Sequence, residues 1–403
     1  MLQDLDHDGF IDIYVGVDAI PTGNKFATHK GGNPAWTRRG GQWREVRKEW
    51  GVGFEANCVC VPAADFDNDG HVDVYLTALG PNRLLKGRGD GTFVDVTTAA
   101  GVGDPGFSTA ALWFDYDKDG HLDLFVGNYV AWSPDTDLFC SLVGDTKSYC
   151  TPESYQGQSP TLYRNRGDQT FEDVTTAAGL RAPSAKALGV AMLDVDSDGW
   201  MDLFVTNDTQ PDQLFRNRGD GTFAEVGRYA GVEASDWSWQ PVFLDVDLDG
   251  YEDLLVTNGH LHDVNDRDSQ AKFARVPKAK RSQVGLLMFP PNTTANVAYR
   301  NLGNFKFAET GQAWGFNSPQ TSHGIATGDL DNDGDLDLVI NCLNQPPLVY
   351  RNDTIAPRVA VQLRGLPPNT HGIGARVTVV VGKIRQTQEI VAGGRYLSGD
   401  QPL

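Results

Sequence analysis

The stretch that decides the fold runs from Leu193 to Val205 and reads LDVDSDGWMDLFV. It places four aspartates around a single glycine and then continues as an apolar run. Alternating carboxylates followed by glycine are typical of a loop that wraps around a cation, and the apolar run is typical of a buried strand. Taken alone, the stretch fits an EF-hand, a catalytic carboxylate cluster or a structural calcium loop. The rest of the chain distinguishes these three alternatives.

Six copies of the pattern D-x-D-x-D-G-x-x-D occur along the 403 residues. Their aspartates are Asp4, Asp6, Asp8 and Asp12; Asp65, Asp67, Asp69 and Asp73; Asp115, Asp117, Asp119 and Asp123; Asp194, Asp196, Asp198 and Asp202; Asp245, Asp247, Asp249 and Asp253; and Asp329, Asp331, Asp333 and Asp337. The copies begin 61, 50, 79, 51 and 84 residues apart. A basic period near 50 residues is in the range of propeller blades, and the two longest spacings predict insertions at 129–160 and 259–297.

A second motif, such as LFRNRGDGTFAEV at 214–226, follows the second to the fifth loops. Its alternating apolar residues on either side of Gly-Asp-Gly predict two strands joined by a tight hairpin. One repeat then contains four short strands, the first entering the Asp loop and the second leaving it. Four antiparallel strands repeated around an axis predict an all-β fold, a β-propeller, and a solenoid is the rival architecture. We expect the first repeat to lack its first strand and the last repeat to lack its fourth.

Each Asp loop offers oxygen ligands in the arrangement that calcium prefers. Calcium takes about six to eight oxygens, and side chains at positions 1, 3 and 5 of a tight loop point to its interior. The glycine at position 6 allows the left-handed turn that wraps the chain around the ion. A backbone carbonyl at position 7 and the aspartate at position 9 complete the set. We therefore predict up to six calcium ions, one for each motif.

The other interpretations of the loop fail on particular positions. An EF-hand has a bidentate Glu at position 12 between two helices, but position 12 is here Tyr, Leu, Val or Ile beside an expected strand. A glycosidase needs one pair of carboxylates in distinct environments, which six equivalent clusters do not provide. Magnesium usually binds through one or two carboxylates and several waters, so four carboxylates point to calcium. We predict no catalytic residues in the loops.

Charge and composition restrict the remaining function classes. The formal net charge of −19 argues against a nucleic-acid partner, and 24 of the 53 acidic residues belong to the loops. The sequence has no apolar run long enough for a membrane span. Cys140 and Cys150 lie in one irregular segment and could form a disulfide, whereas Cys58, Cys60 and Cys342 are expected to be small buried residues.

The loops and hairpins together resemble the FG-GAP or VCBS repeats, the calcium-bearing blades of integrin α-chain propellers. Residues 369–401, NTHGIGARVTVVVGKIRQTQEIVAGGRYLSGDQ, resemble the ASPIC/UnbV domain that follows such repeats in bacterial secreted proteins and in the cartilage acidic protein family. The resemblance implies a propeller at 1–352 and an incomplete ASPIC/UnbV-like β domain at 353–403. It also implies seven blades, so the seventh would lie upstream or lack an Asp loop.

Three further features attract attention but have simpler explanations. RGD occurs three times, always in the predicted hairpin turn, where glycine and aspartate are the residues that such turns favour. His260 and His262 lie in a polar insertion that could bind a metal or ligand. Trp237 and Trp239 could stack on a sugar, although we expect them to pack within a blade.

These observations predict an exported, calcium-stabilised propeller that binds a protein or a glycan as an adhesion scaffold. Extracellular calcium sites work at calcium levels that the cytosol does not supply, so we expect an extracellular, periplasmic or cell-surface location. Only three residues precede the first motif, so an export signal would lie upstream of this chain. The alternative is a polysaccharide lyase or hydrolase on the same scaffold, with its active site outside the loops. The identity of the partner does not follow from the fold.

Overall fold

The protein is described by a computed structural model. The structure describes residues 2–3, 5, 12–15, 20–22, 25–27, 32–39, 42–54, 56–143, 146–148, 150–277, 285–357, 359, 361, 363–365, 375–382 and 384–390. The aspartates at positions 1, 3 and 5 of the first loop, Asp4, Asp6 and Asp8, lie outside these residues.

Six antiparallel sheets follow one another along the chain, and each sheet is one blade. The strands of blades 1 to 3 are β1 (Leu2–Gln3), β2 (Asp12–Tyr14), β5 (Ala35–Arg39) and β6 (Gln42–Glu45); β7 (Ala63–Ala64), β8 (Asp73–Leu76), β9 (Arg83–Gly87) and β10 (Phe93–Asp95); and β11 (Ser108–Phe114), β12 (Asp123–Asn128), β15 (Thr161–Asn165) and β16 (Phe171–Asp173). The strands of blades 4 to 6 are β17 (Ala187–Leu193), β18 (Asp202–Asn207), β19 (Gln213–Asn217) and β20 (Phe223–Glu225); β21 (Ser238–Leu244), β22 (Asp253–Asn258), β23 (Val297–Asn301) and β24 (Phe307–Glu309); and β25 (Ser322–Gly328), β26 (Asp337–Cys342) and β27 (Leu348–Tyr350).

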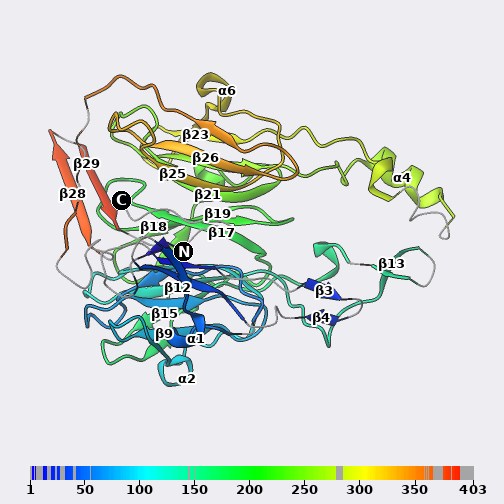
Figure 1. Cartoon of the computed structure of the whole chain (residues 1–403). Helices are drawn as coiled ribbons and strands as arrows, with labels where there is room; N and C mark the ends of the chain where they lie inside the picture. The colour runs from blue at the N-terminus through cyan, green and yellow to red at the C-terminus, as the bar shows by residue number, and fades with distance from the viewer. Residues whose placement is uncertain are drawn as a thin grey trace.

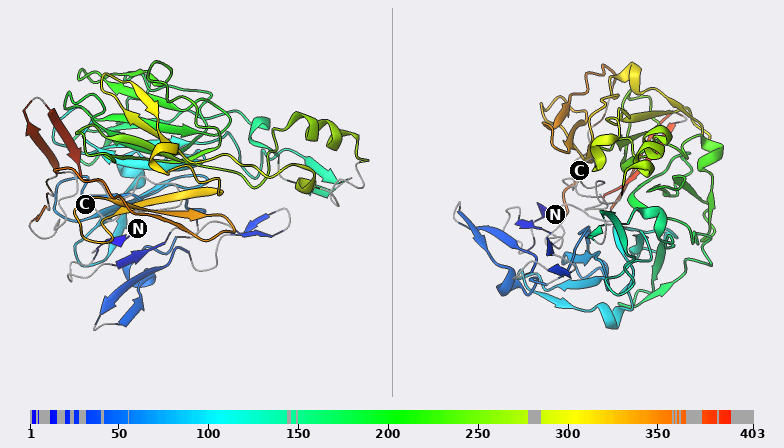
Figure 2. Two further views of the ribbon diagram at one scale, coloured as in Figure 1. Left: turned by 90° about the horizontal axis from the view of Figure 1, so that it is seen from above. Right: turned by 90° about the vertical axis from the view of Figure 1, so that its right-hand side faces the viewer.

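The strand order confirms the predicted propeller with one small correction, in the first repeat. The first repeat does have a first strand, the two-residue β1, which pairs antiparallel with β2. Blade 6 has three strands among the described residues, in agreement with the missing fourth strand. The blades succeed one another around an arc in the right-hand view of Figure 2, from blue to orange. No described helix is both long and apolar enough to cross a membrane.

The hydrophobic core lies between neighbouring blades, which explains why the second strand of a blade is apolar throughout. In blade 4, Phe204 and Leu214 face each other across β18 and β19 and are 0% and 1% exposed. The equivalent pair of blade 6, Val339 and Val349, is 38% and 63% exposed. Among the described residues, this face of blade 6 is therefore not covered by a neighbouring blade.

Three insertions leave the propeller on one side, each between the second and third strands of a blade. They carry the hairpin β3 (Ile20–Thr22) and β4 (Lys25–Ala27) in blade 1, the hairpin β13 (Cys140–Val143) and β14 (Thr146–Ser148) with helix η1 (Pro152–Ser154) in blade 3, and helices α4 (Arg267–Arg275) and η3 (Gly285–Met288) in blade 5. The insertions of blades 3 and 5 were predicted, whereas that of blade 1 was not. All three extend to the right in Figure 1.

One-turn helices close four of the blades after their fourth strand. They are α1 (Arg47–Trp50), α2 (Thr97–Ala100), α3 (Gly227–Ala230) and α6 (Gly311–Trp314). Each helix ends at a glycine with a left-handed backbone, for example Gly231 with a φ of 81°. Glycine adopts that conformation without a steric cost, so it ends the helix and directs the chain into the next blade.

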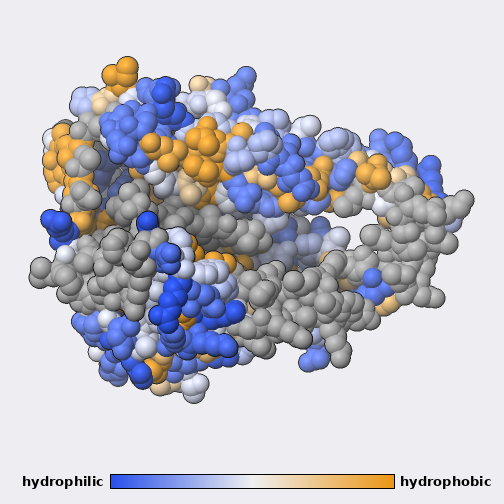
Figure 3. Space-filling model, viewed as in Figure 1, coloured by the Kyte–Doolittle hydropathy of each residue, from blue (hydrophilic) through white to orange (hydrophobic). Residues whose placement is uncertain are grey.

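The C-terminal segment contains an antiparallel hairpin of β28 (Arg376–Val381) and β29 (Ile384–Glu389). The hairpin lies at the left of Figure 1, on the side away from the insertions. Figure 3 shows apolar side chains over β28, where Val380 and Val381 are 66% and 65% exposed.

Candidate metal centre

The Asp loops connect the first and second strands of each blade, as predicted, and bring three carboxylates together in each of blades 2 to 6. The ligand atoms of each group lie within 4.8 Å of one another. The groups are Asp65, Asp67 and Asp73; Asp115, Asp117 and Asp123; Asp194, Asp196 and Asp198; Asp245, Asp247 and Asp249; and Asp329, Asp331 and Asp333.

Two left-handed residues give the loop its tight turn. The predicted glycine at position 6 is one, with a φ of 90° at Gly199. The residue at position 4 is the other, with φ values of 57° at Asn68, 59° at Lys118 and 62° at Ser197. Non-glycine residues seldom adopt this conformation, so the turn carries backbone strain that the surrounding contacts must offset.

The aspartate at position 1 is held by the loop's own backbone. In blade 4 the backbone N–H of Gly199 donates a hydrogen bond of 2.7 Å to Asp194 Oδ2. Gly250 donates in the same way to Asp245 Oδ2, at 3.0 Å, in blade 5. In blade 5 the other oxygen, Asp245 Oδ1, also accepts a backbone hydrogen bond, from Asp249 N at 3.0 Å.

The aspartate at position 9 joins the carboxylate group of blades 2 and 3 and also links parts of its own blade by hydrogen bonds. Both oxygens of Asp202 accept backbone hydrogen bonds, Oδ2 from Val195 N at 3.0 Å and Oδ1 from Asn217 N at 2.7 Å. The residue is 1% exposed and joins the start of the loop to the third strand. The sequence predicted a fourth metal ligand here, and the geometry adds a structural clip at the same position.

A side-chain amide continues this clip into the preceding blade. Asn217 Nδ2 donates to the carbonyl oxygen of Tyr116, in the blade-3 loop, at 2.9 Å. Asn301 Nδ2 of blade 5 likewise reaches Val195 O of blade 4 at 3.2 Å. Equivalent bonds join Asn165 to Phe66 and Asn352 to Val246. The Asp loops of blades 2 to 6 are therefore connected by hydrogen bonds from blade to blade.

A basic residue from the third strand pairs with the carboxylates of positions 3 and 5. The sequence motif contained this residue, but its role became visible only in the structure. Arg164 Nε lies 2.8 Å from Asp117 Oδ2, and Arg300 Nε lies 2.6 Å from Asp247 Oδ2. Lys86 and Arg216 make the same contacts, and Arg351, which follows β27, lies 4.0 Å from Asp331 Oδ2.

The loop interior contains carboxylate oxygens that the protein itself does not satisfy. Asp117 Oδ1, Asp194 Oδ1 and Asp247 Oδ1 are buried and have no hydrogen-bond partner among the described residues. Buried polar atoms are normally paired, so these three oxygens are positions where a cation would fit. Hard oxygen donors of this kind fit calcium.

The electrostatics of the loops agree with that conclusion. Burial, followed by the neighbouring carboxylates, raises the pKa of Asp194 to about 6. The same causes raise the pKa of Asp65 and Asp245 to about 6. Burial raises the pKa of Asp123 to about 9 and that of Asp253 to about 8. Without a cation the folded loops hold their negative charges at a cost, which a bound dication would relieve.

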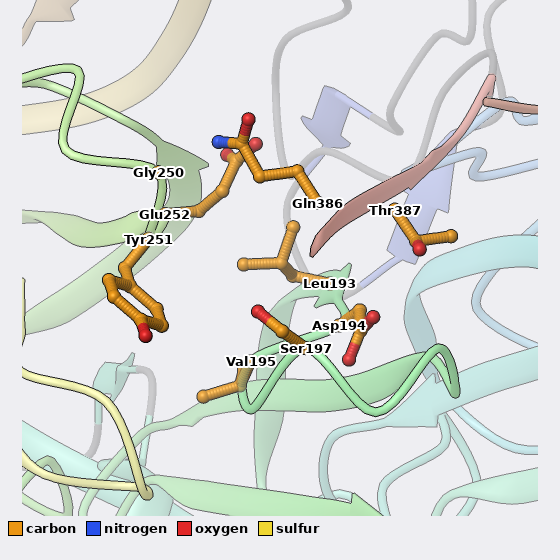
Figure 4. Close-up of a pocket in the computed structure, with 9 residues that line it drawn as sticks. All are labelled: Leu193, Asp194, Val195, Ser197, Gly250, Tyr251, Glu252, Gln386 and Thr387. Carbon is orange, nitrogen blue, oxygen red and sulfur yellow. The ribbon is translucent and has the colours of Figure 1, made fainter. Parts of the chain in front are cut away.

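The C-terminal hairpin packs directly on the Asp loops. Gln386 Nε2 donates to Asp245 Oδ2 at 3.0 Å, and Asp115 N donates to Glu389 Oε1 at 3.2 Å. Figure 4 shows Gln386 and Thr387 lining one small pocket together with Asp194 of blade 4 and Glu252 of blade 5. The hairpin therefore covers part of the loop side of the propeller.

The other residues singled out in the sequence are structural in their described contacts. In each RGD turn the aspartate accepts a hydrogen bond from the second residue after it, as Asp220 Oδ1 does from Thr222 N at 3.0 Å, which confirms the turn role. Cys140 and Cys150 form a disulfide, and Cys58, Cys60 and Cys342 are buried.

The four aromatic residues near the blade-5 insertion pack in two pairs. Trp237 stacks on His260 with ring centroids 4.8 Å apart. Trp239 packs against His323 of blade 6 at 4.2 Å. His262 N donates to His260 Nδ1 at 3.3 Å, and its own ring lies 3.1 Å from Phe289 O. These contacts place aromatic and imidazole rings at the end of the blade opposite to the Asp loop.

The chain matches the FG-GAP-like repeat over residues 4–76, 65–126, 135–205, 194–256 and 286–340. It is 24% identical to cartilage acidic protein 1 of Homo sapiens over 358 residues, which cover 84% of this chain and 46% of that protein. It is 26% identical to cartilage acidic protein 1 of Mus musculus over 275 residues, which cover 64% and 39%. The chain thus spans less than half the length of these relatives.

Among solved structures, the chain is similar to a lectin of Agrocybe aegerita described as specifically recognising non-reducing terminal N-acetylglucosamine. The TM-score is 0.42 at 15% identity, covering 88% of this chain and 80% of the lectin. It is also similar to the V. cholerae biofilm matrix protein Bap1, with a TM-score of 0.31 at 18% identity, covering 63% and 33%. Because the repeat matches well over half of its residues, this chain belongs to the FG-GAP-like repeat family.

Proposed function

We propose that this protein is an exported calcium-binding propeller that presents a binding surface for a glycan or protein ligand. The observation that carries the calcium part is the set of buried, unpartnered carboxylate oxygens inside equivalent loops. Three carboxylates converge in each of five described loops, and the first loop repeats the same sequence. In this proposal the four aspartates of every motif bind the ion or clip the loop around it.

Calcium stabilises the propeller because it binds the folded loops and not the unfolded chain. One ion contributes about 2.7 kcal/mol when its concentration is a hundredfold above the dissociation constant. Millimolar calcium, which is characteristic of extracellular modules, would fill weak loops of this kind. We therefore place the protein outside the cytosol, in the periplasm, at the cell surface or in the extracellular space.

The binding surface in this proposal is the end of the propeller opposite to the Asp loops. Insertions in blades 1, 3 and 5 all project there (Figure 1). Long loops on a rigid scaffold are where binding residues concentrate. Trp237 and His260 lie at the base of the blade-5 insertion and offer aromatic surface for a sugar ring or a partner side chain.

The calcium part is tested by melting curves recorded with calcium and with an excess of chelator. We expect chelation to lower the melting temperature by about 10 °C or more, since several sites are lost together. The Asp247→Asn variant should reduce this difference, and Asp268→Asn in α4 is the matched control because it removes one exposed charge outside the loops. Identical melting curves with and without chelator would contradict calcium binding.

The ligand part is tested by a glycan array and a pull-down with cell-surface proteins, each with and without calcium. Binding that requires calcium and is lost in Trp237→Ala supports the scaffold. Turnover of a polysaccharide would instead support the alternative enzyme function. A protein that binds calcium but retains no glycan or protein would refute the binding role while leaving the metal role intact.

A further inference from the structure

The basic residue of the third strand occupies the same register in five blades. In blade 4, Phe215 pairs with Leu203, and Arg216 is the next residue. In the other blades, the residue that follows the equivalent paired residue is Lys86 in blade 2, Arg164 in blade 3, Arg300 in blade 5 and Arg351 in blade 6. In blade 1 the step from Trp36, which pairs with Ile13, gives the neutral residue Thr37.

In blades 2 to 5 this cation contacts the Oδ2 atoms of two loop carboxylates, those of positions 3 and 5. Arg216 Nη2 lies 2.7 Å from Asp196 Oδ2 and 3.4 Å from Asp198 Oδ2. Arg164 and Arg300 take the same Oδ2 atoms of positions 3 and 5 in their own loops, and Lys86 Nζ lies 3.0 Å from Asp69 Oδ2. The contact is therefore built the same way in four loops.

At position 5 the second oxygen accepts a hydrogen bond from the loop backbone, as Asp198 Oδ1 does from Trp200 N at 2.9 Å, so the oxygens left for an ion are those of position 3 in blades 3 and 5. Asp117 Oδ1 and Asp247 Oδ1, the partners of the atoms that the arginines hold, are buried without a hydrogen-bond partner among the described residues. In blade 4 the unpartnered oxygen belongs to Asp194, which is 6% exposed. A cation that merely replaced the metal would sit on these unpartnered oxygens. These cations instead bind the Oδ2 atoms, and in doing so they fix the direction of the Oδ1 atom of the same carboxylate.

We propose that Lys86, Arg164, Arg216 and Arg300 are positioning residues of the metal sites, a role that rests on the proposed calcium binding. They orient two carboxylates per loop and offset part of the negative charge that remains around a bound dication. Residues that orient metal ligands in this way typically contribute about 10- to 100-fold to metal affinity. The side chain of Arg216 is 43% exposed, so its ion pairs contribute little to the stability of the metal-free protein.

The same geometry predicts differences among the loops. Arg351 lies 4.0 Å from Asp331 Oδ2 and 2.6 Å from Asp353 Oδ1, so it holds the blade-6 loop less closely. Blade 1 has Thr37 at the corresponding position. We therefore expect blades 2 to 5 to bind the ion more tightly than blades 1 and 6.

Terbium luminescence tests the proposal in blade 4, because Trp200 occupies position 7 of that loop and can sensitise a bound terbium ion. The signal that Trp200→Phe removes, and that calcium displaces, reports this loop. In Arg216→Gln we expect the terbium concentration at half saturation to rise about tenfold or more. Arg216→Lys should restore most of the affinity, since blade 2 uses Lys86. The control Arg218→Gln makes the same change two residues further along the hairpin and should leave the affinity unchanged.

Each outcome supports or overturns the proposal. If Arg216→Gln bound terbium as tightly as the parent protein or more tightly, the proposed positioning role would be overturned. The melting temperature of Arg216→Gln in chelator should stay close to that of the parent protein. If Arg216 had a purely structural role, this melting temperature would fall. Arg216→Met, which keeps the aliphatic stem near Phe305, replaces Arg216→Gln if that variant fails to fold. A parent protein without calcium-displaceable luminescence would refute the calcium proposal itself.

Discussion

The end of each blade that carries the Asp loop is almost the same from blade 2 to blade 5, whereas the opposite end differs from blade to blade. At the loop end, the same aspartates, glycine and third-strand cation recur in the same contacts. At the opposite end, blade 2 and blade 4 turn directly into the third strand while blades 1, 3 and 5 carry insertions. Repetition at one end and variation at the other indicate that the loops support the fold and that the insertions distinguish this protein.

The largest effect is expected from the clip at position 9 of the Asp loop. Asp202→Asn replaces one accepting oxygen by an NH₂ group that faces a backbone N–H donor, so a buried hydrogen bond becomes a repulsive contact. We expect the free energy of unfolding to fall by about 2–4 kcal/mol. Urea unfolding in chelator measures this effect, and Asp220→Asn in the exposed hairpin turn is the control. Equal midpoints for the two variants would show that the clip is dispensable.

A smaller loss is expected from breaking the link between neighbouring loops. Asn217→Ala removes the hydrogen bonds to Tyr116 O of blade 3 and to Gly219 N within the turn. Because the residue is buried, we expect a loss of about 1–3 kcal/mol in the free energy of unfolding. Calcium affinity in the blade-3 loop should fall as well, since its second residue loses an anchor. A variant as stable as the parent would mean that each blade holds its loop independently.

At the opposite end, a buried acid predicts how stability depends on pH. Burial raises the pKa of Asp212 to about 7, and the hydrogen bonds from Asn207 N and the serines lower it only in part. The folded state therefore binds a proton more tightly than the unfolded state, whose aspartate titrates near 3.8. This contribution to stability is complete below about pH 4 and is lost as the pH rises towards 7. Melting curves of Asp212→Asn should show a weaker decline over this range, and an unchanged decline would contradict the assignment.

The smallest change in stability is expected at the insertion end. Trp237→Ala removes a half-buried ring that stacks on His260, so we expect a loss of about 0.5–1.5 kcal/mol with no change in calcium affinity. The same variant should lose ligand binding if the insertions form the binding surface. A large loss of stability together with weaker calcium binding would break the proposed division between the two ends.

The sequence predicted the loop end well because its chemistry lies within a few consecutive residues and recurs six times. The pattern contained the aspartates and Gly199 directly, and it predicted their strands and hairpins. It did not reveal the left-handed residue at position 4, because Asn68, Lys118 and Ser197 share no obvious side-chain property. Contacts that depend on strand register were also missed.

The third-strand cations show why register matters. Arg216 lies 18 residues after Asp198, and only the pairing of β18 with β19 brings them together. Asn217 likewise meets Tyr116 across 101 residues and a blade boundary. The insertion in blade 1 was missed for a different reason, since a spacing of 61 residues differs little from the period. Distances through space between repeats are not encoded in any single repeat.

Hydrogen exchange followed by mass spectrometry, with calcium and with chelator, can show where calcium stabilises the propeller, because it resolves both ends of each blade. We expect calcium to slow exchange in the Asp loops of blades 2 to 5 and in the β28–β29 hairpin that packs on them. Exchange in α4 and in the insertion of blade 3 should stay the same. Equal exchange in the loops under both conditions, or protection confined to the insertions, would contradict the claim that calcium in the Asp loops holds the propeller together.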